Sequence, residues 1–400
     1  MNQSKLAIPK GFVFSAVKAG IKASGGLDLA IAEAPMGASA AVLFTKNRVV
    51  AAPVTVGREH LKASRGRVRA VIVNAGNANC ATGQHGYKAA QQVCAALGQA
   101  LSVAPEFVFP SSTGIIGVPL PSDKLVNAIP QLVSEKSGEE AALCNFSRAI
   151  MTTDTRQKFA CATFGRGQKA VSVLGVAKGS GMIHPNLATM LVYIFTDLEA
   201  TPAQLKSVLR QSCDISFNRI SVDGDTSTND TVLLLANGAS GSKLGEPGTS
   251  KKFLDAVASV CSSLAEQIVA DGEGVKHVIN LVVEGARSPS DADKIARTIA
   301  HSMLCKTAWA GADPNWGRIL AAAGRSGVVF DPDQTNIFIA GQQVCRNGAA
   351  ATFDENVAHQ AMLEPKYDIR VSVGKGRGKA RVLTTDLTTE YVHINADYST

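Results

Sequence analysis

The chain of 400 residues has few aromatic residues, and its apolar runs are short. Aromatic residues make up 5% of the chain, whereas surfaces that bind single-stranded nucleic acid interleave aromatic with basic side chains. A membrane-spanning helix needs roughly 20 consecutive apolar residues, and no run here reaches that length. We therefore expect neither nucleic acid nor a membrane as a partner.

The sequence also lacks the spacings typical of metal sites and disulfide scaffolds. Its eight cysteines form no Cys-x-x-Cys pair and no zinc-type cluster with histidine. We recognise no secretory signal, and a chain that is 46% hydrophobic can build a core without disulfides. These observations predict reduced thiols, a cytoplasmic location and no metal.

Nucleotide-binding motifs are absent as well. There is no Walker A motif and no Gly-x-Gly-x-x-Gly after a strand, and GKGRGK (374–379) is interpreted as the turn of a β-hairpin. We expect no cofactor or prosthetic group. The 40 basic residues outnumber the 33 acidic ones, and the isoelectric point is about 9.0. A basic polyanion-binding protein is therefore a competing hypothesis, although the charges are scattered along the chain.

What is present is an alternation of strand-like and helical segments, which indicates a mixed α/β architecture with helices covering sheets. Residues 49–56 are expected to form a strand, and residues 190–196 a buried central strand. Residues 291–309 are expected to form one amphipathic helix.

The segment KGSGMIHPNLATML (178–191) carries most of the candidate chemistry. A turn with Gly179, Gly181 and Pro185 leads to Ala188 and Thr189 at the mouth of the central strand. A hydroxyl placed after such a turn is where a nucleophile would sit. A phosphate-binding loop or an ordinary β-turn is the alternative interpretation.

This segment resembles the signature of the ornithine acetyltransferase family, which moves an acetyl group from N-acetylornithine to glutamate in arginine biosynthesis. Other segments of the chain resemble the family in the same order. They are VNAGNANCATG (73–83), SSTGIIG (111–117), MTTDT (151–155), DGDTSTNDT (223–231), DGEG (271–274), KTAWAGADPNWGRI (306–319) and NADYST (395–400).

The resemblance implies a self-processing α/β fold of the N-terminal-nucleophile type, with stacked β-sheets flanked by helices. The chain would cleave itself between Ala188 and Thr189. An α fragment (1–188) and a β fragment (189–400) would stay intertwined and assemble as α2β2 or larger.

The implied mechanism is ping-pong acyl transfer through Thr189. Cleavage gives Thr189 a free α-amine with a pKa of about 7.7–8, so that one residue can be both nucleophile and base. The resemblance assigns the oxyanion hole to Thr113 and Gly114, because each tetrahedral intermediate needs preorganised donors.

The resemblance also implies a set of substrate-binding residues. Lys178 would pair with a carboxylate and Glu273 with an ammonium group. Thr153 or Thr155 is an alternative to Thr152, since the three threonines lie in one motif. The full set is Thr152, Lys178, Thr189, Glu273, Asn395 and Thr400.

Some alternatives stay open at this level. A self-processing aminopeptidase or amidohydrolase would use the same nucleophile, although Lys178 and Glu273 favour charged amino-acid substrates. Members of the family either only recycle acetyl groups or also use acetyl-CoA as a co-substrate; no residue decides between the two, and we favour the bifunctional alternative. DPNWGR (313–318) is either a binding loop or a capped turn, and DGDTSTNDT is interpreted as hydrogen-bonded turns.

Overall fold

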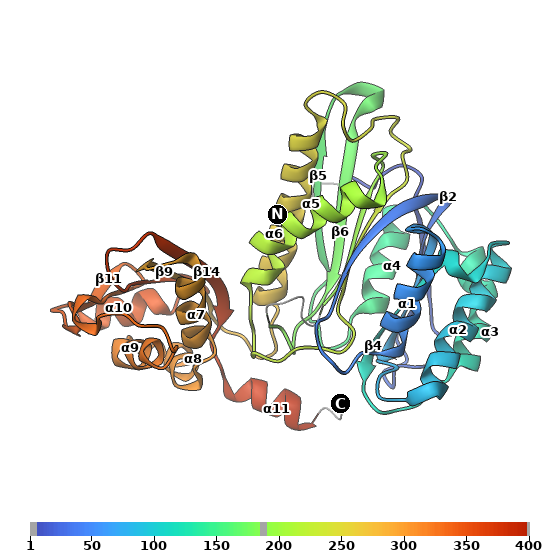
Figure 1. Ribbon diagram of the computed structural model, residues 1–400. Helices are drawn as coiled ribbons and strands as arrows, with labels where there is room; N and C mark the ends of the chain where they lie inside the picture. Colours follow the sequence, from blue (N-terminus) through green and yellow to red (C-terminus); the bar gives the residue numbers. More distant parts are fainter. Residues whose placement is uncertain (1–5, 185–189, 398–400) are drawn as a thin grey trace.

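A computed structural model describes residues 6–184 and 190–397, which form two lobes side by side (Figure 1). The first lobe is built on an eight-stranded sheet in which β1 (Val13–Val17) pairs with β2. The order of the other strands is β4 (Val108–Ile115), β3 (Arg67–Asn77), β2 (Leu29–Phe44), β8 (Thr231–Ala236), β7 (Leu191–Thr196), β6 (Val171–Lys178) and β5 (Lys158–Phe164).

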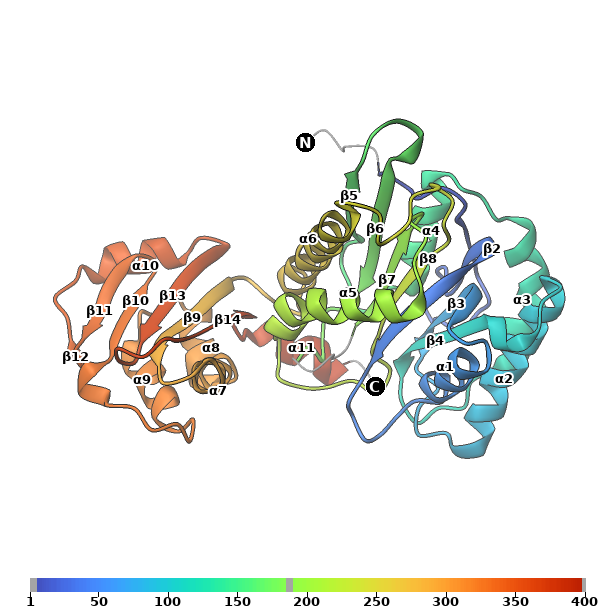
Figure 2. The ribbon, with the colours of Figure 1, turned by 45° about the horizontal axis from the view of Figure 1, so that its top comes forward.

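Helices cover both faces of this sheet. On one face α5 (Pro202–Ile215) and α6 (Thr249–Ala270) lie side by side (Figure 2). On the other face lies α4 (Glu140–Ile150). Beside β3 and β4 lie α1 (Ala52–Ala63), α2 (Gly83–Ala100) and α3 (Ser122–Ser134).

Strand β7 shows why the centre of this sheet is buried. Val192 and Ile194 pack into the core below α5 and α6, whereas Tyr193 and Phe195 pack into the core below α4. A strand that is buried on both faces needs an uninterrupted apolar run. The predicted central strand at 190–196 is confirmed, with bounds Leu191–Thr196.

The second lobe has a six-stranded sheet with α7 (Pro289–Ala300), α8 (Met303–Ala310) and α9 (Trp316–Gly324) along one face. The strand order is β12 (Ala349–Ala350), β11 (Gln342–Arg346), β10 (Asn336–Ile339), β13 (Lys366–Ser372), β9 (Val278–Ala286) and β14 (Gly378–Thr385). α10 (Glu355–Met362) precedes β13, and α11 (Thr389–Asp397) returns from this lobe to the first one (Figure 1).

Four short 3-10 helices complete the described elements: Pro105–Phe107, Gly167–Lys169, Phe217–Arg219 and Pro332–Gln334. The predicted mixed α/β class, with sheets flanked by helices, is confirmed. Within the first sheet, β7 and β8 lie between β2 and β6. Two adjacent strands from after residue 189 therefore lie between strands from before it in one sheet.

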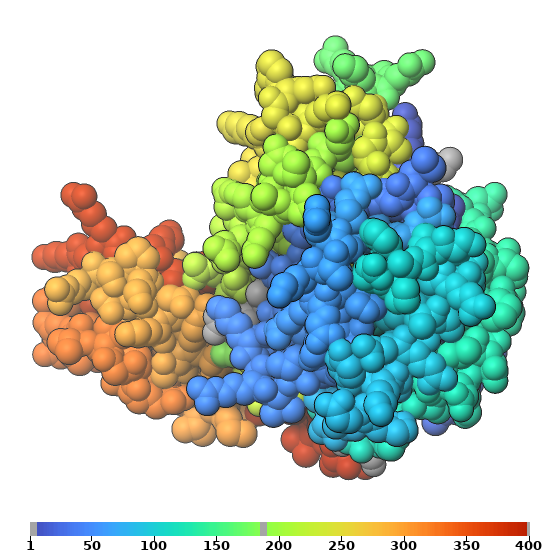
Figure 3. Space-filling view, turned by 45° about the vertical axis from the view of Figure 1, so that its right-hand side comes forward, coloured from blue at the N-terminus to red at the C-terminus, as the bar shows by residue number. Residues whose placement is uncertain are grey.

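The two sheets divide the chain between α6 and β9, not at the proposed fragment boundary. The space-filling view shows the second lobe, mostly orange, beside the first (Figure 3). The division into 1–188 and 189–400 concerns processing and stays a prediction. The described strands on either side of the proposed cut both belong to the first lobe, since β6 and β7 are neighbours in its sheet.

Among the described residues, α6 is the one helix long and apolar enough to span a bilayer by length and composition. Half of its most apolar window is buried within the protein, where it packs against β5, β6 and α5. This burial is typical of a core helix.

Two local expectations were wrong. Residues 49–56 do not form a strand, because α1 begins at Ala52 with Pro53 in its first turn, where the fixed φ of proline suits a helix. Residues 291–309 form two helices instead of one. The chain turns at His301, and the Ser302 side chain accepts the Cys305 backbone N–H to begin α8.

The GKGRGK segment is not a hairpin turn. β13 and β14 do not pair, because β9 lies between them, parallel to β13 and antiparallel to β14. The connection crosses the end of β9 in close backbone contact: a Cβ on Gly285 would lie 2.2 Å from the Gly374 carbonyl oxygen, and one on Gly376 2.0 Å from that of Ala286. The glycines are needed for this crossing.

Candidate active site

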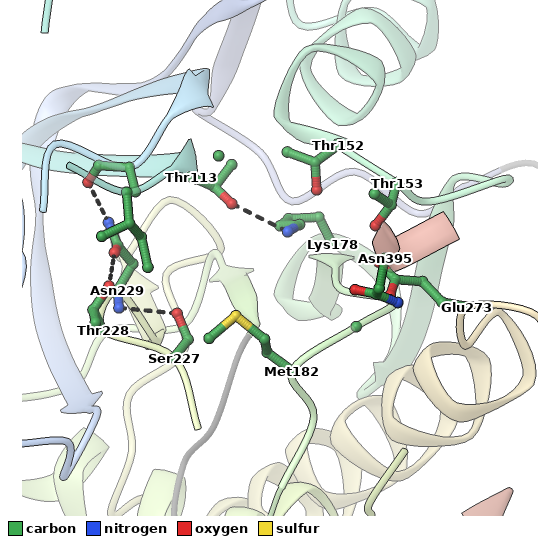
Figure 4. A pocket seen from close by; sticks show the side chains of 14 residues that line it. Thr113, Thr152, Thr153, Lys178, Met182, Ser227, Thr228, Asn229, Glu273 and Asn395 are labelled. Carbon is green, nitrogen blue, oxygen red and sulfur yellow. Dashed lines mark hydrogen bonds between the residues drawn. The ribbon is translucent and has the colours of Figure 1, made fainter. Parts of the chain in front are cut away.

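A cavity of about 600 Å³, part of it open to solvent, lies in the first lobe at the end of β6 (Figure 4). It is lined from segments far apart in the sequence, including α11. The lining residues are Ala78, Thr113, Gly114, Ile116, Thr152, Thr153, Lys178, Gly181, Met182, Ser227, Thr228, Asn229, Glu273 and Asn395.

The predicted oxyanion residues lie at the end of β4, which runs parallel to β3. Gly114 has φ 130°, and a Cβ there would lie 2.3 Å from the backbone carbon of Gly76. Only glycine fits this close approach. The tight contact between the ends of β3 and β4 fixes the backbone beside Thr113.

Lys178 is the last residue of β6 and is almost completely buried. Its Nζ donates a hydrogen bond to Thr113 Oγ1 over 3.1 Å (Figure 4). Burial lowers the pKa of the Lys178 ammonium group, and the carboxylate of Asp154 is the strongest influence in the opposite direction. The cavity therefore holds a desolvated amine, and its charged form would suit a carboxylate ligand.

A buried ion-pair group lies behind Lys178. Lys158, which is fully buried, is 2.7 Å from Asp154 Oδ1 and 2.5 Å from Asp271 Oδ2. Asp154 also accepts the backbone N–H of Gly179 at 2.7 Å. Burial opposes ionisation of Asp154, but the ammonium groups of Lys178 and Lys158 outweigh it and keep the pKa of Asp154 below its usual value.

The acidic side of the cavity is formed by Glu273, two residues after Asp271. Asn395 Nδ2 on α11 donates to Glu273 Oε2 at 2.9 Å. A Cβ on Gly181 would lie 2.4 Å from the same oxygen, so glycine at 181 makes room for the carboxylate. A carboxylate and a buried ammonium thus face one cavity from different sides.

The segment 223–231 borders the same cavity and holds the chain on both sides of the undescribed residues. Asp223 Oδ2 accepts the N–H of Met182 at 2.6 Å, and Met182 has a left-handed backbone with φ 54°. Asp230 Oδ1 accepts the N–H of Met190 at 2.8 Å. The predicted hydrogen-bonded turns are present, for example from the N–H of Asp225 to Asp223 Oδ1.

His184 lies just before the undescribed residues and had no predicted role. Its Nδ1 is 3.1 Å from His301 Nε2, which is 3.0 Å from Ser221 Oγ. Burial lowers the pKa of both imidazoles, that of His301 to about 3, so the pair is neutral at pH 7. These histidines do not line the cavity.

Residues 13–400 match the family model "ArgJ family". The arginine biosynthesis bifunctional protein ArgJ of Geobacter sulfurreducens is 42% identical over 394 residues, which is 98% of this chain and 99% of that protein. The protein of the same name from Thermus thermophilus is 42% identical over 393 residues, with coverage of 98% and 99%.

The chain belongs to the ArgJ family. The resemblance seen in the sequence is thereby confirmed. A crystal structure of arginine biosynthesis bifunctional protein argJ from Bacillus halodurans is 36% identical and covers 52% of this chain and 98% of its own, with a TM-score of 0.49. The ornithine acetyltransferase of Mycobacterium tuberculosis, complexed with ornithine, is 36% identical and covers 46% and 97%, with a TM-score of 0.40.

In this ArgJ-family chain, most of the predicted site residues line one cavity. Three of the predicted positions, Ala188, Thr189 and Thr400, lie outside the described residues, so their roles stay predictions. The predicted residues brought together are Thr113, Gly114, Thr152, Lys178, Glu273 and Asn395. Thr153 lines the cavity too, whereas the Thr155 hydroxyl donates to Asp271 behind it.

Several residues beside the cavity had no predicted role. Asp154 and Asp271 belong to motifs that the sequence marked, but nothing in the sequence shows that Lys158 joins them. Asn229 and Asp230 precede the apolar strand β8, and this polar pair at the start of a strand is the sequence signal that could have indicated them.

Residues 313–318 lie in the second lobe, where the Asn315 side chain caps α9 by accepting a hydrogen bond from the Arg318 backbone N–H. Residues 6–184 and 190–397 contain no group of three His, Cys, Asp or Glu suited to a metal.

Proposed function

We propose that this ArgJ-family chain transfers the acetyl group of N-acetylornithine to glutamate, as part of arginine biosynthesis. One observation carries the proposal: Thr113, Gly114, Lys178 and Glu273 face one cavity. The names of the relatives, arginine biosynthesis bifunctional protein, support the pathway.

We propose that the chain first cleaves itself between Ala188 and Thr189. Hydrolysis of this peptide bond consumes one water and leaves a carboxylate on Ala188 and a free amine on Thr189. The position of β7 and β8 between β2 and β6 supports this step, because the two fragments would remain held by the pairing of β6 with β7 and of β2 with β8.

In the transfer reaction, Thr189 Oγ would attack the acetyl carbonyl while the α-amine of Thr189 takes the hydroxyl proton. The C–N bond to ornithine breaks, its nitrogen receives that proton, and an acetyl ester remains on Thr189. The amine of glutamate then attacks the ester, and the proton it loses returns to the Thr189 oxygen. Thr113 and Gly114 would stabilise the oxyanion of both steps.

Lys178 and Glu273 would select the substrates. Ornithine and glutamate both carry an α-carboxylate, which the buried Lys178 ammonium can bind, and acetylornithine adds a side-chain ammonium, which suits Glu273. An amine that binds at this site would resolve the ester in place of water, which favours acetyl transfer over the aminopeptidase alternative.

Three further expectations belong to this proposal. The enzyme would also make N-acetylglutamate from acetyl-CoA, it would work in the cytoplasm, and its fragments would assemble as α2β2 or larger. The eight cysteines are all free thiols, which suits a reducing compartment.

Intact-mass analysis of the wild type beside Thr189→Ala tests the proposal. We expect the wild type to give two fragments with the masses of 1–188 and 189–400, and the variant to remain one chain of 41.6 kDa. Wild-type protein should then release ornithine from acetylornithine in a glutamate-dependent reaction. A single uncleaved species in both samples would remove the N-terminal amine and this mechanism with it.

A further inference from the structure

The polar pair at the entrance to β8 connects two parts of the proposed active site. We propose that Asn229 and Asp230 are positioning residues that set the spacing between the oxyanion donors and the Thr189 nucleophile. This inference rests on the proposed function and adds to it two buried residues that act through the backbone groups to which they are hydrogen-bonded.

Asn229 holds the strand that carries the oxyanion residues. Its Nδ2 donates to the carbonyl oxygen of Ser112 at 2.8 Å and to that of Ala78 at 2.7 Å. Figure 4 shows Asn229 beside Thr228 at the cavity. Thr228 Oγ1 donates to Asn229 Oδ1 at 2.6 Å, which fixes the orientation of the amide. The Asn229 side chain is buried, and Ser112 immediately precedes Thr113. This contact therefore fixes the position of the oxyanion loop, the end of β4 that carries Thr113 and Gly114.

Asp230 holds the chain on the nucleophile side. Its Oδ1 accepts the N–H of Met190 at 2.8 Å, and the backbone N–H of the next residue, Thr231, donates to the Met190 carbonyl oxygen at 3.1 Å. Met190 is the residue bonded to Thr189, and both of its backbone groups are thus held by the start of β8. Asp230 is 2% exposed, so water competes little for this contact.

Because residues 229 and 230 are neighbours, one peptide unit joins the two anchors, a Cα separation of about 3.8 Å. The oxyanion residues would belong to the α fragment, whereas Thr189 would begin the β fragment. After cleavage no covalent bond near the site joins them, and contacts such as these must keep their spacing. A misplacement of about 1 Å at a reacting centre can lower a rate roughly 10²-fold.

The test compares Asp230→Ala, Asp230→Asn and Asn229→Asp with the wild type. Asp225→Ala is the matched control, because this exposed acid lies in the same segment and its carboxylate accepts no hydrogen bond from the chain within the described ranges. The time course of cleavage is followed by intact mass. For cleaved protein, kcat and KM for acetylornithine are measured per active site, counted from the acetyl-enzyme formed.

We expect Asp230→Ala and Asn229→Asp to slow cleavage at least tenfold and to lower kcat tenfold or more, with KM within about threefold of the wild type. Asp230→Asn keeps an oxygen that can accept the Met190 N–H and should recover most of the rate. Asp225→Ala should match the wild type.

The inference is overturned if Asp230→Ala cleaves and turns over like the wild type, if KM changes instead of kcat, or if Asp230→Asn is no better than Asp230→Ala. If Asp230→Ala does not fold, Asn229→Asp decides by the same criteria. The proposed function fails separately, when the wild type itself stays uncleaved or transfers no acetyl group.

Discussion

Lys178 Nζ donates a hydrogen bond to Thr113 Oγ1 over 3.1 Å, which joins a predicted substrate-binding residue to a predicted oxyanion residue. A threonine hydroxyl that accepts a hydrogen bond from an ammonium group still has its own proton to donate. The lysine thus orients the Thr113 hydroxyl as a donor toward the cavity. If Lys178 binds the substrate carboxylate and Thr113 stabilises the oxyanion, as proposed, this contact would couple the two roles.

Replacing Lys178 with methionine should weaken the binding of both substrates, because N-acetylornithine and glutamate each carry an α-carboxylate. A hydrogen bond to a charged group contributes about 1.5–3 kcal/mol, so kcat/KM should fall roughly 10–100-fold for each substrate. Steady-state assays that vary one substrate at a time measure both values. An effect on one substrate alone would contradict the shared carboxylate site.

Gly114→Ala should lower kcat, because its Cβ would collide with the backbone of Gly76 and displace the oxyanion loop. Loss of one oxyanion donor typically costs about 10²–10³ in rate. Gly117→Ala is the matched control from the same motif: its φ is 83°, and a Cβ there meets nothing within 4 Å. Equal losses of kcat in the two variants would show that strain, and not the collision, is responsible.

Lys158→Met should destabilise the fold, because it leaves Asp154 and Asp271 buried without their common cation. Breaking a buried ion pair on one side costs about 3–5 kcal/mol. The control is Arg156→Ala, whose side chain is 59% exposed and lies 3.3 Å from Asp271, so the expected loss is below about 1 kcal/mol. Urea unfolding at pH 7 compares the two free energies, and a smaller loss for Lys158→Met than for Arg156→Ala would contradict this account.

Asp223 should make stability depend on pH between about 4 and 6. Burial raises the pKa of this carboxyl from 3.8 to about 6, so the unfolded chain ionises first and the folded protein loses stability as pH rises through this window. Asp223→Asn removes the titration. The free energy of unfolding of the variant, relative to that of the wild type, should rise by roughly 2 kcal/mol between pH 4 and pH 7, as measured by urea unfolding. A difference that is constant with pH would show that Asp223 ionises normally.

The sequence was sufficient for the central strand and for the mixed α/β class, although the expectations at 49–56 and 291–309 were wrong. The apolar run at 190–196 predicted the buried strand, and the polar segments around it predicted the loops of the site. It failed where distant segments decide the pairing. GKGRGK has the composition of a hairpin turn, but β9 lies between the two strands that it joins, and nothing within the segment specifies that neighbour.

By itself the sequence determined which residue types are available for acyl transfer and, through its motifs, the family to which the chain belongs. Only the tertiary structure decided how those residues meet. Lys158 is an ordinary lysine in the sequence but lies between Asp154 and Asp271, which are 117 residues apart along the chain (271 − 154). The same is true of Asn229, whose amide reaches both Ala78 and Ser112. Such contacts form because a buried polar group must find a hydrogen-bond partner, and the sheet pairing brings that partner from a distant segment.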